Sequence, residues 1–262
     1  MKTEVIFCID GSGSMGSKAT DVRGGFNTYV DELKKDKDGQ YSLSAVVFNT
    51  SVFPLFTQKE LKEVPELTDK NYVPGGGTAL YDAIGAALDE VKDSTANYCV
   101  HCGKKRGSSH KFCATCGNEL TNGKSKYLLI VMTDGEENSS LKYRKHHIVQ
   151  KIKDKEGQGN WTVVYLGANQ DAMAEGTAMG ASAGNTLTYR VADTKTYYSA
   201  LATSTANFAG GQSLNSTSFG MDVDGAYLGI KNTPTDTTSA TTPATYPVAV
   251  TSHRLWKKGE KK

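Results

Sequence analysis

Short apolar runs alternate along the chain with longer stretches in which apolar residues recur every three or four positions. The short runs are typical of buried strands, and the recurring pattern is typical of helices packed against them. We expect strands at residues 4–10, 41–48, 51–56, 126–133, 161–166 and 186–191. We expect helices at residues 17–36, 79–93, 141–155, 170–180 and 194–207. This alternation predicts an α/β fold with a doubly wound, mostly parallel, six-stranded sheet.

One connection in this pattern departs from the alternation. Only Asn49 and Thr50 separate the second predicted strand from the third. A connection that short joins antiparallel strands, because a parallel pair needs a crossover of a dozen or more residues. The third strand should therefore run antiparallel at an edge. In open sheets of this kind, ligands bind outside the carboxyl ends of the strands, where Asp10 and Asp134 are both expected.

The end of the first predicted strand carries the sequence Asp10-Gly-Ser12-Gly-Ser14, which places a carboxylate and two hydroxyls on one turn. Thr78 follows three glycines, and Asp134 follows the apolar run of the fourth strand. Hard cations such as Mg²⁺ prefer oxygen ligands. If the hydroxyls bind directly and the carboxylates act largely through water, the ion stays under-neutralised and attracts a further carboxylate. The pattern predicts a binding site for Mg²⁺, or for Mn²⁺ or Ca²⁺.

These residues, in this order, resemble the metal-ion-dependent adhesion site of the von Willebrand factor A domain family, whose pattern is Asp-x-Ser-x-Ser, then Thr, then Asp. The resemblance covers roughly residues 3–210, apart from an insertion. It implies a Rossmann-like fold and a non-enzymatic module whose metal is completed by an Asp or Glu of a protein partner. Glu136 and Glu137, beside the third loop, are expected at the rim of the site. The metal-site residues that the resemblance implies are Asp10, Ser12, Ser14, Thr78 and Asp134.

Two other interpretations use the same loop. Gly11, Gly13 and Gly16 match the dinucleotide-binding fingerprint after a strand, but that fingerprint needs an acidic residue at the end of the next strand, where Asn49 stands. A haloacid-dehalogenase-like phosphohydrolase would have a second Asp at the position of Ser12, and without it the reaction lacks its general acid. The phosphohydrolase is kept as an alternative from a different class.

A second motif consists of two Cys-x-x-Cys pairs, each followed by glycine. Four thiolates in tetrahedral geometry suit Zn²⁺, and glycine permits the tight turn of each knuckle. The motif predicts a zinc ribbon inserted after the second helix, projecting from the end of the sheet opposite the adhesion site. Iron is the alternative metal, because rubredoxin uses the same knuckles. The predicted ligands are Cys99, Cys102, Cys113 and Cys116.

These motifs divide the chain into three parts. The A-type domain is expected at residues 1–96 and 124–210, with the zinc ribbon at 97–123. Residues 211–262 are expected to form an extended, irregular arm, because the stretch 233–245 is nearly all Thr, Ser, Ala, Pro and Asp. Such a composition buries too little apolar surface to offset the entropy of ordering.

Composition narrows the choice of partners. The 262-residue chain carries a net charge of +2, and no long basic stripe with interleaved aromatics indicates nucleic acid. No run approaches the length of a membrane span, and no signal peptide is visible, so a cytoplasmic location is expected. The resemblance is greatest to small stand-alone domains of bacteria and their viruses. It suggests either an adaptor, such as one that delivers a client to an AAA+ ATPase, or a structural or accessory component of a virus particle.

Overall fold

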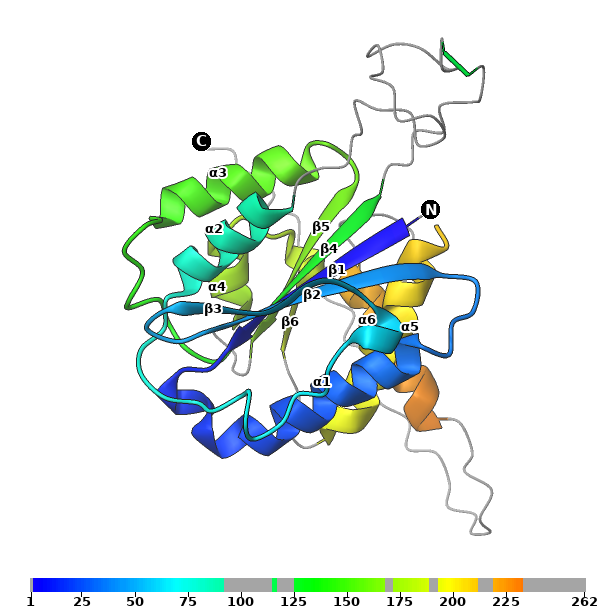
Figure 1. Cartoon of the computed structure of the whole chain (residues 1–262), viewed down its shortest axis with the longest axis horizontal. Helices are drawn as coiled ribbons and strands as arrows, with labels where there is room; N and C mark the ends of the chain where they lie inside the picture. The colour runs from blue at the N-terminus through cyan, green and yellow to red at the C-terminus, as the bar shows by residue number, and fades with distance from the viewer. Residues whose placement is uncertain are drawn as a thin grey trace, which may run out of the picture. The chain divides into compact units, whose positions relative to one another are not determined.

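A computed structural model describes the following residues: 2–91, 115–116, 125–167, 172–188, 193–211 and 219–232. Within these residues, one six-stranded sheet has the order β3-β2-β1-β4-β5-β6 (Figure 1). Its strands are β1 (Lys2–Asp10), β2 (Gln40–Phe48), β3 (Val52–Glu60), β4 (Lys126–Thr133), β5 (Trp161–Gly167) and β6 (Thr186–Thr188). The predicted doubly wound, mostly parallel sheet is confirmed.

The β2–β3 hairpin is the antiparallel exception. Phe48 pairs with Val52 across the turn, while the other neighbouring strands pair in parallel. β3 lies at the edge, as predicted, but it extends beyond residue 56 to Glu60. Its last residues are exposed and polar, so the apolar pattern could not indicate that they continue the strand.

Helices cover both faces of the sheet (Figure 1). On one face, α1 and α5 pack side by side and α6 lies against α5; α2 and α3 cover the other face, where α4 packs against β5 and β6. No helix in the described ranges is both long and apolar enough to cross a membrane. The helices are α1 (Ala19–Leu33), α2 (Leu80–Glu90), α3 (Lys145–Glu156), α4 (Ala172–Ala178), α5 (Thr194–Ala209) and α6 (Phe219–Asn232).

β1 is buried on both faces because it lies in the middle of the sheet. Phe7 contacts Phe26 and Tyr29 of α1 in edge-to-face geometry, with ring centroids 5.3 and 5.0 Å apart. The neighbouring Cys8 points to the α2 side. α1 and α5 approach closely at Gly25, where an added Cβ would lie 2.4 Å from the ring of Tyr198. The apolar strand that ends at Asp10 is thus fixed from both sides.

Two predicted helices differ from the structure, and two further predicted elements are described only in part. The region predicted as helix 17–36 begins with a 3-10 helix at Gly13–Lys18 and continues as α1. The helix predicted at 141–155 begins only at Lys145, because the preceding backbone N–H groups bond to Asp82 of α2 rather than to helical carbonyls. Parts of the predicted elements 170–180 and 186–191 lie outside the described residues.

The prediction of an irregular arm from residue 211 is wrong for its first part. Phe219, Val223 and Tyr227 recur every four residues on α6 and are buried in the same cluster as α5. The Phe219 ring meets that of Phe208 at a centroid distance of 6.1 Å. The sequence signal was weak because the helix contains several glycines. Residues 233–262, the rest of the predicted arm, lie outside the described residues.

The predicted zinc ribbon also lies outside the described residues, apart from Thr115 and Cys116. Cys116 is exposed. The ligand roles of Cys99, Cys102, Cys113 and Cys116 stay predictions. Apart from these two residues, the described chain stops after α2 and resumes just before β4. β4 pairs in parallel with β1, so its first residue lies at the amino end of the strands, at the other end of the sheet from Asp10. The position of the insertion itself stays a prediction.

A buried carboxylate in β1 gives the fold a pH dependence. Glu4 accepts hydrogen bonds from Ser44 Oγ at 3.2 Å and Gln58 Nε2 at 3.0 Å, yet burial raises its pKa above the ordinary value despite these bonds. The folded state therefore retains a proton that the unfolded state releases. Stability should fall as the pH rises from the ordinary Glu pKa through the folded-state pKa of Glu4.

Glu4→Gln is expected to remove this loss, so the variant should be more stable than the wild type at neutral pH and lose that advantage near pH 4. The free energy of urea unfolding, measured from pH 4 to 8 in EDTA, tests this. Glu66→Gln, at an exposed position, is the control. Parallel pH profiles for Glu4→Gln and wild type would contradict the assignment.

Candidate metal site

Asp10 is fully buried at the end of β1. One carboxylate oxygen accepts the Ser12 backbone N–H at 2.7 Å, and the other accepts the Thr133 hydroxyl at 2.6 Å. The Tyr72 hydroxyl donates to the Asp10 carbonyl at 2.6 Å. Burial raises the pKa of Asp10 more than these side-chain hydrogen bonds lower it, and the charge of Asp134 raises it further. The carboxylate is therefore held in one orientation in a poorly solvated place.

Two serines connect Asp10 to the loop that follows β4. The Ser12 and Ser14 hydroxyls are 3.0 Å apart, and Ser14 Oγ donates to Asp134 Oδ1 at 2.6 Å. The other oxygen of Asp134 pairs with Lys18 Nζ. Ser12 is buried and Ser14 is exposed, so the group opens to solvent on the Ser14 side.

Thr78 comes from a third loop and is buried. Its N–H donates to Asn138 Oδ1 at 2.8 Å, and the Asn138 N–H donates to the Thr78 carbonyl at 3.0 Å. Gly13 N–H donates to the Gly76 carbonyl at 3.0 Å. The three loops are thus joined by backbone bonds, and they bring together all five residues predicted for the adhesion site.

The two predicted rim residues have different surroundings. Glu136 is exposed. The Glu137 carboxylate accepts the N–H groups of Tyr81, Ser139 and Ser140 at 2.9, 2.8 and 2.7 Å. Glu137 therefore caps the start of α2 and shapes its own loop, which is a structural role that sequence reasoning missed.

Asp82 makes the reciprocal connection. Its carboxylate accepts the N–H groups of Leu141, Lys142 and Tyr143 at 2.9, 3.0 and 2.8 Å, and its own N–H donates to Ser140 Oγ at 3.0 Å. Together with Glu137, it fixes the Asp134 loop to the helix that follows Thr78. The helix dipole favours an acidic residue in the first turn, but Asp82 bonds to another segment, and no local sequence signal indicates that contact.

The donor set and the space between the loops fit a hard divalent cation. A Cβ added at Gly135 would lie 3.4 Å from Thr78 Oγ1 and 3.7 Å from Ser14 Oγ, so the missing side chain leaves room between two of the predicted ligands. Three hydroxyls and two carboxylates are all oxygen donors, as Mg²⁺ and Mn²⁺ prefer. Across the described residues, no three His, Cys, Asp or Glu side chains converge as ligands; the hydroxyls are essential to the candidate site.

Gly135→Ala is expected to weaken Mn²⁺ binding by about tenfold, since one methyl group would occupy the space between Thr78 and Ser14. Isothermal titration calorimetry with Mn²⁺ measures the change. Gly16→Ala is the matched control, because an added Cβ there meets nothing within 4 Å. Equal affinities for the two variants would mean that the cation does not occupy this space.

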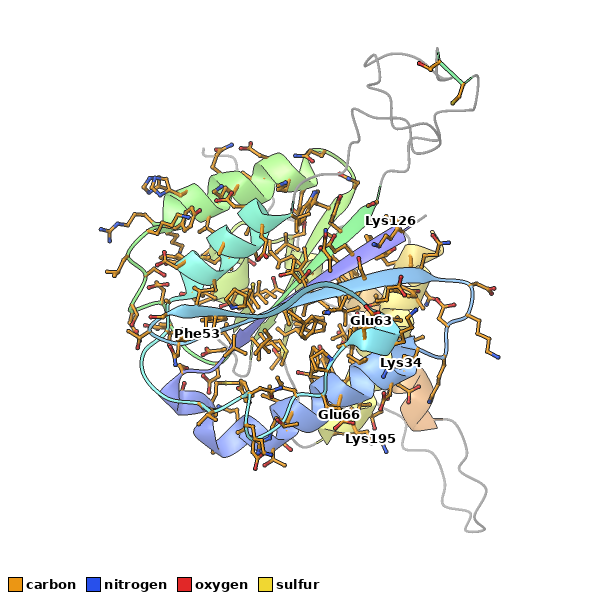
Figure 2. All side chains as sticks on the ribbon, in the orientation of Figure 1. Lys34, Phe53, Glu63, Glu66, Lys126 and Lys195 are labelled. Atoms are coloured by element: carbon orange, nitrogen blue, oxygen red, sulfur yellow. The ribbon has the colours of Figure 1, made fainter. Side chains whose placement is uncertain are left out.

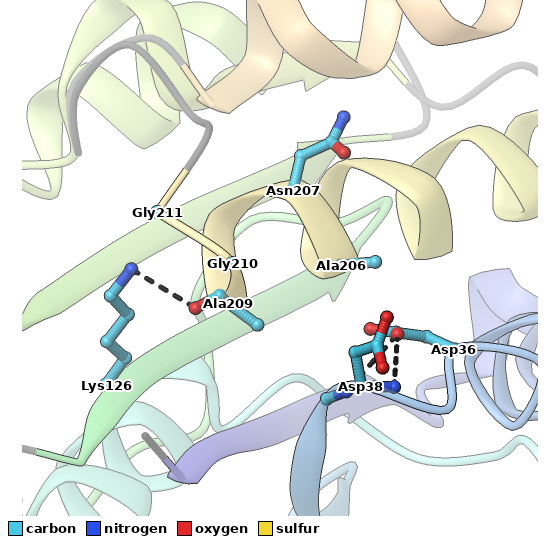
Figure 3. Close-up of a pocket in the computed structure, with 9 residues that line it drawn as sticks. Asp36, Asp38, Lys126, Ala206, Asn207, Ala209, Gly210 and Gly211 are labelled. Carbon is cyan, nitrogen blue, oxygen red and sulfur yellow. Dashed lines mark hydrogen bonds between the residues drawn. The ribbon is translucent and has the colours of Figure 1, made fainter.

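A second feature is a cavity of about 510 Å³, and Figure 3 shows the residues that line it. It is bordered by Asp36 and Asp38, which precede β2, and by Lys126 at the start of β4. Lys126 Nζ donates to the Ala209 carbonyl at 3.5 Å, and burial lowers its pKa. β2 and β4 both begin beside the cavity, and the candidate metal site lies where strands end. The two sites therefore occupy opposite ends of the sheet.

The fold and these three loops define an α/β protein with a candidate cation site of the adhesion type at the carboxyl edge of its sheet. The family model for the von Willebrand factor type A domain matches residues 4–203. The chain belongs to this family. No match was found among curated proteins.

Several solved structures are similar to this chain at low sequence identity. The pilus adhesin SpaC of Lactobacillus rhamnosus GG is 13% identical with a TM-score of 0.53, over 79% of this chain and 30% of that one. Proximal thread matrix protein 1 of the mussel byssus is 16% identical, with a TM-score of 0.49, over 76% of this chain and 46% of that one. Manganese-loaded TRAP of Plasmodium vivax is 22% identical, with a TM-score of 0.40, over 64% and 58%. The chain thus spans less than half of the mussel protein.

Proposed function

We propose that the chain is a divalent-cation-dependent protein-interaction module that binds a carboxylate of its partner. The observation that carries this proposal is the convergence of Asp10, Ser12, Ser14, Thr78 and Asp134 around a space that Gly135 leaves open. Membership of the A-domain family supports it.

Each residue has a distinct task in this proposal. Ser12, Ser14 and Thr78 would hold the cation through neutral hydroxyls, and Asp10 and Asp134 would orient those hydroxyls and supply negative charge. A divalent cation so held supplies an electrophilic position for an Asp or Glu of the partner. Mg²⁺ is the proposed ion, with Mn²⁺ or Ca²⁺ as alternatives, because all the donors are oxygens.

The surroundings of the site suit a protein partner. Large side chains exposed among the described residues include Phe53, Val73 and Leu141, at 49%, 68% and 88% exposure. Val73 precedes the Thr78 loop and Leu141 follows the Asp134 loop. Phe53 lies beside the β2–β3 turn (Figure 2), and β2 ends next to Asp10. Apolar side chains beside a polar site can form the core of a protein interface, which is more apolar than its rim.

The absence of catalysis, the location, the partner class and the metal of the insertion are proposed from the sequence. The module is proposed to be non-enzymatic, since Ser12 occupies the position at which a phosphohydrolase of the haloacid dehalogenase type would need its acid. Its location is proposed to be cytoplasmic, with an AAA+ ATPase or virion proteins as candidate partners. The insertion is proposed to bind Zn²⁺, or iron, through its four cysteines.

The proposal is tested by affinity capture from a lysate of the native host in Mg²⁺ and in EDTA. We expect a protein that is captured by the wild type in Mg²⁺ and lost both in EDTA and with Ser12→Ala/Ser14→Ala. Ser51→Ala, at an exposed position in the β2–β3 turn, is the control. Identical captures under all conditions would reject cation-dependent binding, and phosphatase turnover that is lost in Asp10→Asn would favour the enzyme instead.

A further inference from the structure

Lys18 contacts the candidate site although the adhesion motif does not include it. It is the last residue of the 3-10 helix Gly13–Lys18, directly after the loop that carries Ser12 and Ser14. Its Nζ pairs with Asp134 Oδ2, while Ser14 Oγ donates to Oδ1. Both oxygens of Asp134 are therefore engaged, one by a neutral hydroxyl and one by a positive charge.

The ion pair satisfies an electrostatic need of the site. Asp134 is only 3% exposed at its side chain, and Asp10 is fully buried. Two carboxylates that share a poorly solvated space repel each other, and a buried charge without a partner is strongly unfavourable. The Lys18 ammonium neutralises one of the two charges.

The same contact opposes a divalent cation. A cation that approaches Asp134 meets a carboxylate whose charge is already compensated, and it is repelled by the ammonium at a distance of a few ångströms. Lys18 is 25% exposed and has a flexible four-carbon stem. It can therefore move into solvent while Ser14 keeps its bond to the other oxygen of Asp134.

We propose that Lys18 is a tethered counter-ion of Asp134 that competes with the divalent cation, lowers the metal affinity of the site and is released when the cation binds. This inference rests on the proposed cation site. Once displaced by the cation, the Lys18 ammonium would lie beside the position at which an acidic partner approaches. Its positive charge would then favour binding of that partner.

The first test is a calorimetric titration of the full chain with Mn²⁺. Lys18→Met keeps most of the length of the side chain and removes its charge, and it is expected to bind Mn²⁺ about tenfold more tightly than the wild type, within the range usual for coupled sites. Lys18→Arg keeps the charge and is expected to remain close to the wild type. Lys35→Met, which breaks an exposed ion pair with Glu32 at the far end of α1, is the control.

The second test follows the lysine itself. Because coupling between two binding events is reciprocal, Mn²⁺ should expose the Lys18 amine. Acetylation by an N-hydroxysuccinimide ester, read by mass spectrometry, should increase severalfold at Lys18 when Mn²⁺ is added and stay constant at Lys34 and Lys35.

The outcomes separate this inference from the proposed function. If the wild type binds Mn²⁺ and Lys18→Met binds it equally or more weakly, the competition is refuted while the cation site stands; weaker binding would make Lys18 a support for Asp134. If adding Mn²⁺ leaves the acetylation of Lys18 unchanged, release of the lysine is also refuted. If neither protein binds Mn²⁺, both the cation site and the competition are rejected.

Discussion

Asp10→Asn is expected to lower the affinity for Mn²⁺ by at least about a hundredfold, or roughly 2.7 kcal/mol of binding free energy. The substitution removes one of the two negative charges of the site. It also places an amide where the Ser12 N–H and the Thr133 hydroxyl both donate, and an amide nitrogen cannot accept either bond. Rotation or displacement of residue 10 would disturb the loop that carries the two serines.

The fold should tolerate this substitution. Burial already raises the pKa of Asp10, so removing the charge also removes a desolvation cost that offsets the lost hydrogen bond. Calorimetric Mn²⁺ titration and urea unfolding, performed on the same preparations, separate loss of the site from loss of the fold. Asp38→Asn, at an exposed position near the opposite edge of the sheet, should bind Mn²⁺ as the wild type does. Wild-type affinity in Asp10→Asn would place the cation elsewhere.

The sheet could be predicted from the sequence because its strands carry strong local signals. The apolar runs of β1, β4 and β5 are buried along nearly their whole length, as expected of strands covered by helices on both faces. The short turn at Asn49 was sufficient to identify the antiparallel edge. The start of α3 could not be predicted, because Asp82 bonds to backbone groups that are distant in sequence. A local sequence pattern cannot show such a contact.

The candidate site was predictable to the same degree. Parallel strands bring their carboxyl ends to the same end of the sheet, so Asp10 and Asp134 were expected together. The structure connects them through Ser12 and Ser14. The contacts that sequence reasoning missed include those of Asn138 with Thr78 and of Lys18 with Asp134. Each depends on how one side chain is directed within a loop, which the spacing of residues does not determine. Cation binding by these residues stays a prediction.

Phe219→Ala is expected to destabilise the domain by about 3–5 kcal/mol, the usual range for loss of a fully buried phenylalanine. Phe219 begins α6, is completely buried and packs edge to face against Phe208 of α5. Its N–H donates to Asn185 Oδ1 at 2.9 Å, and Asn185 is buried as well. Removing the ring would leave a cavity where α6 joins the core, which α5 and α1 share.

Urea unfolding of Phe219→Ala and of two truncated chains measures how far the domain extends. A chain that ends at Asn232 should keep the stability of the full protein, because the compact unit ends there, whereas a chain that ends at Gly210 should lose at least as much stability as Phe219→Ala. The control is Thr203→Ala, a substitution at an exposed position on α5. It lies outside the contact between Phe219 and Phe208 and should leave the stability unchanged. Equal stability of the two truncated chains would show that α6 packs too weakly to belong to the folded unit, and the boundary would return to the position near residue 210 that the sequence indicates.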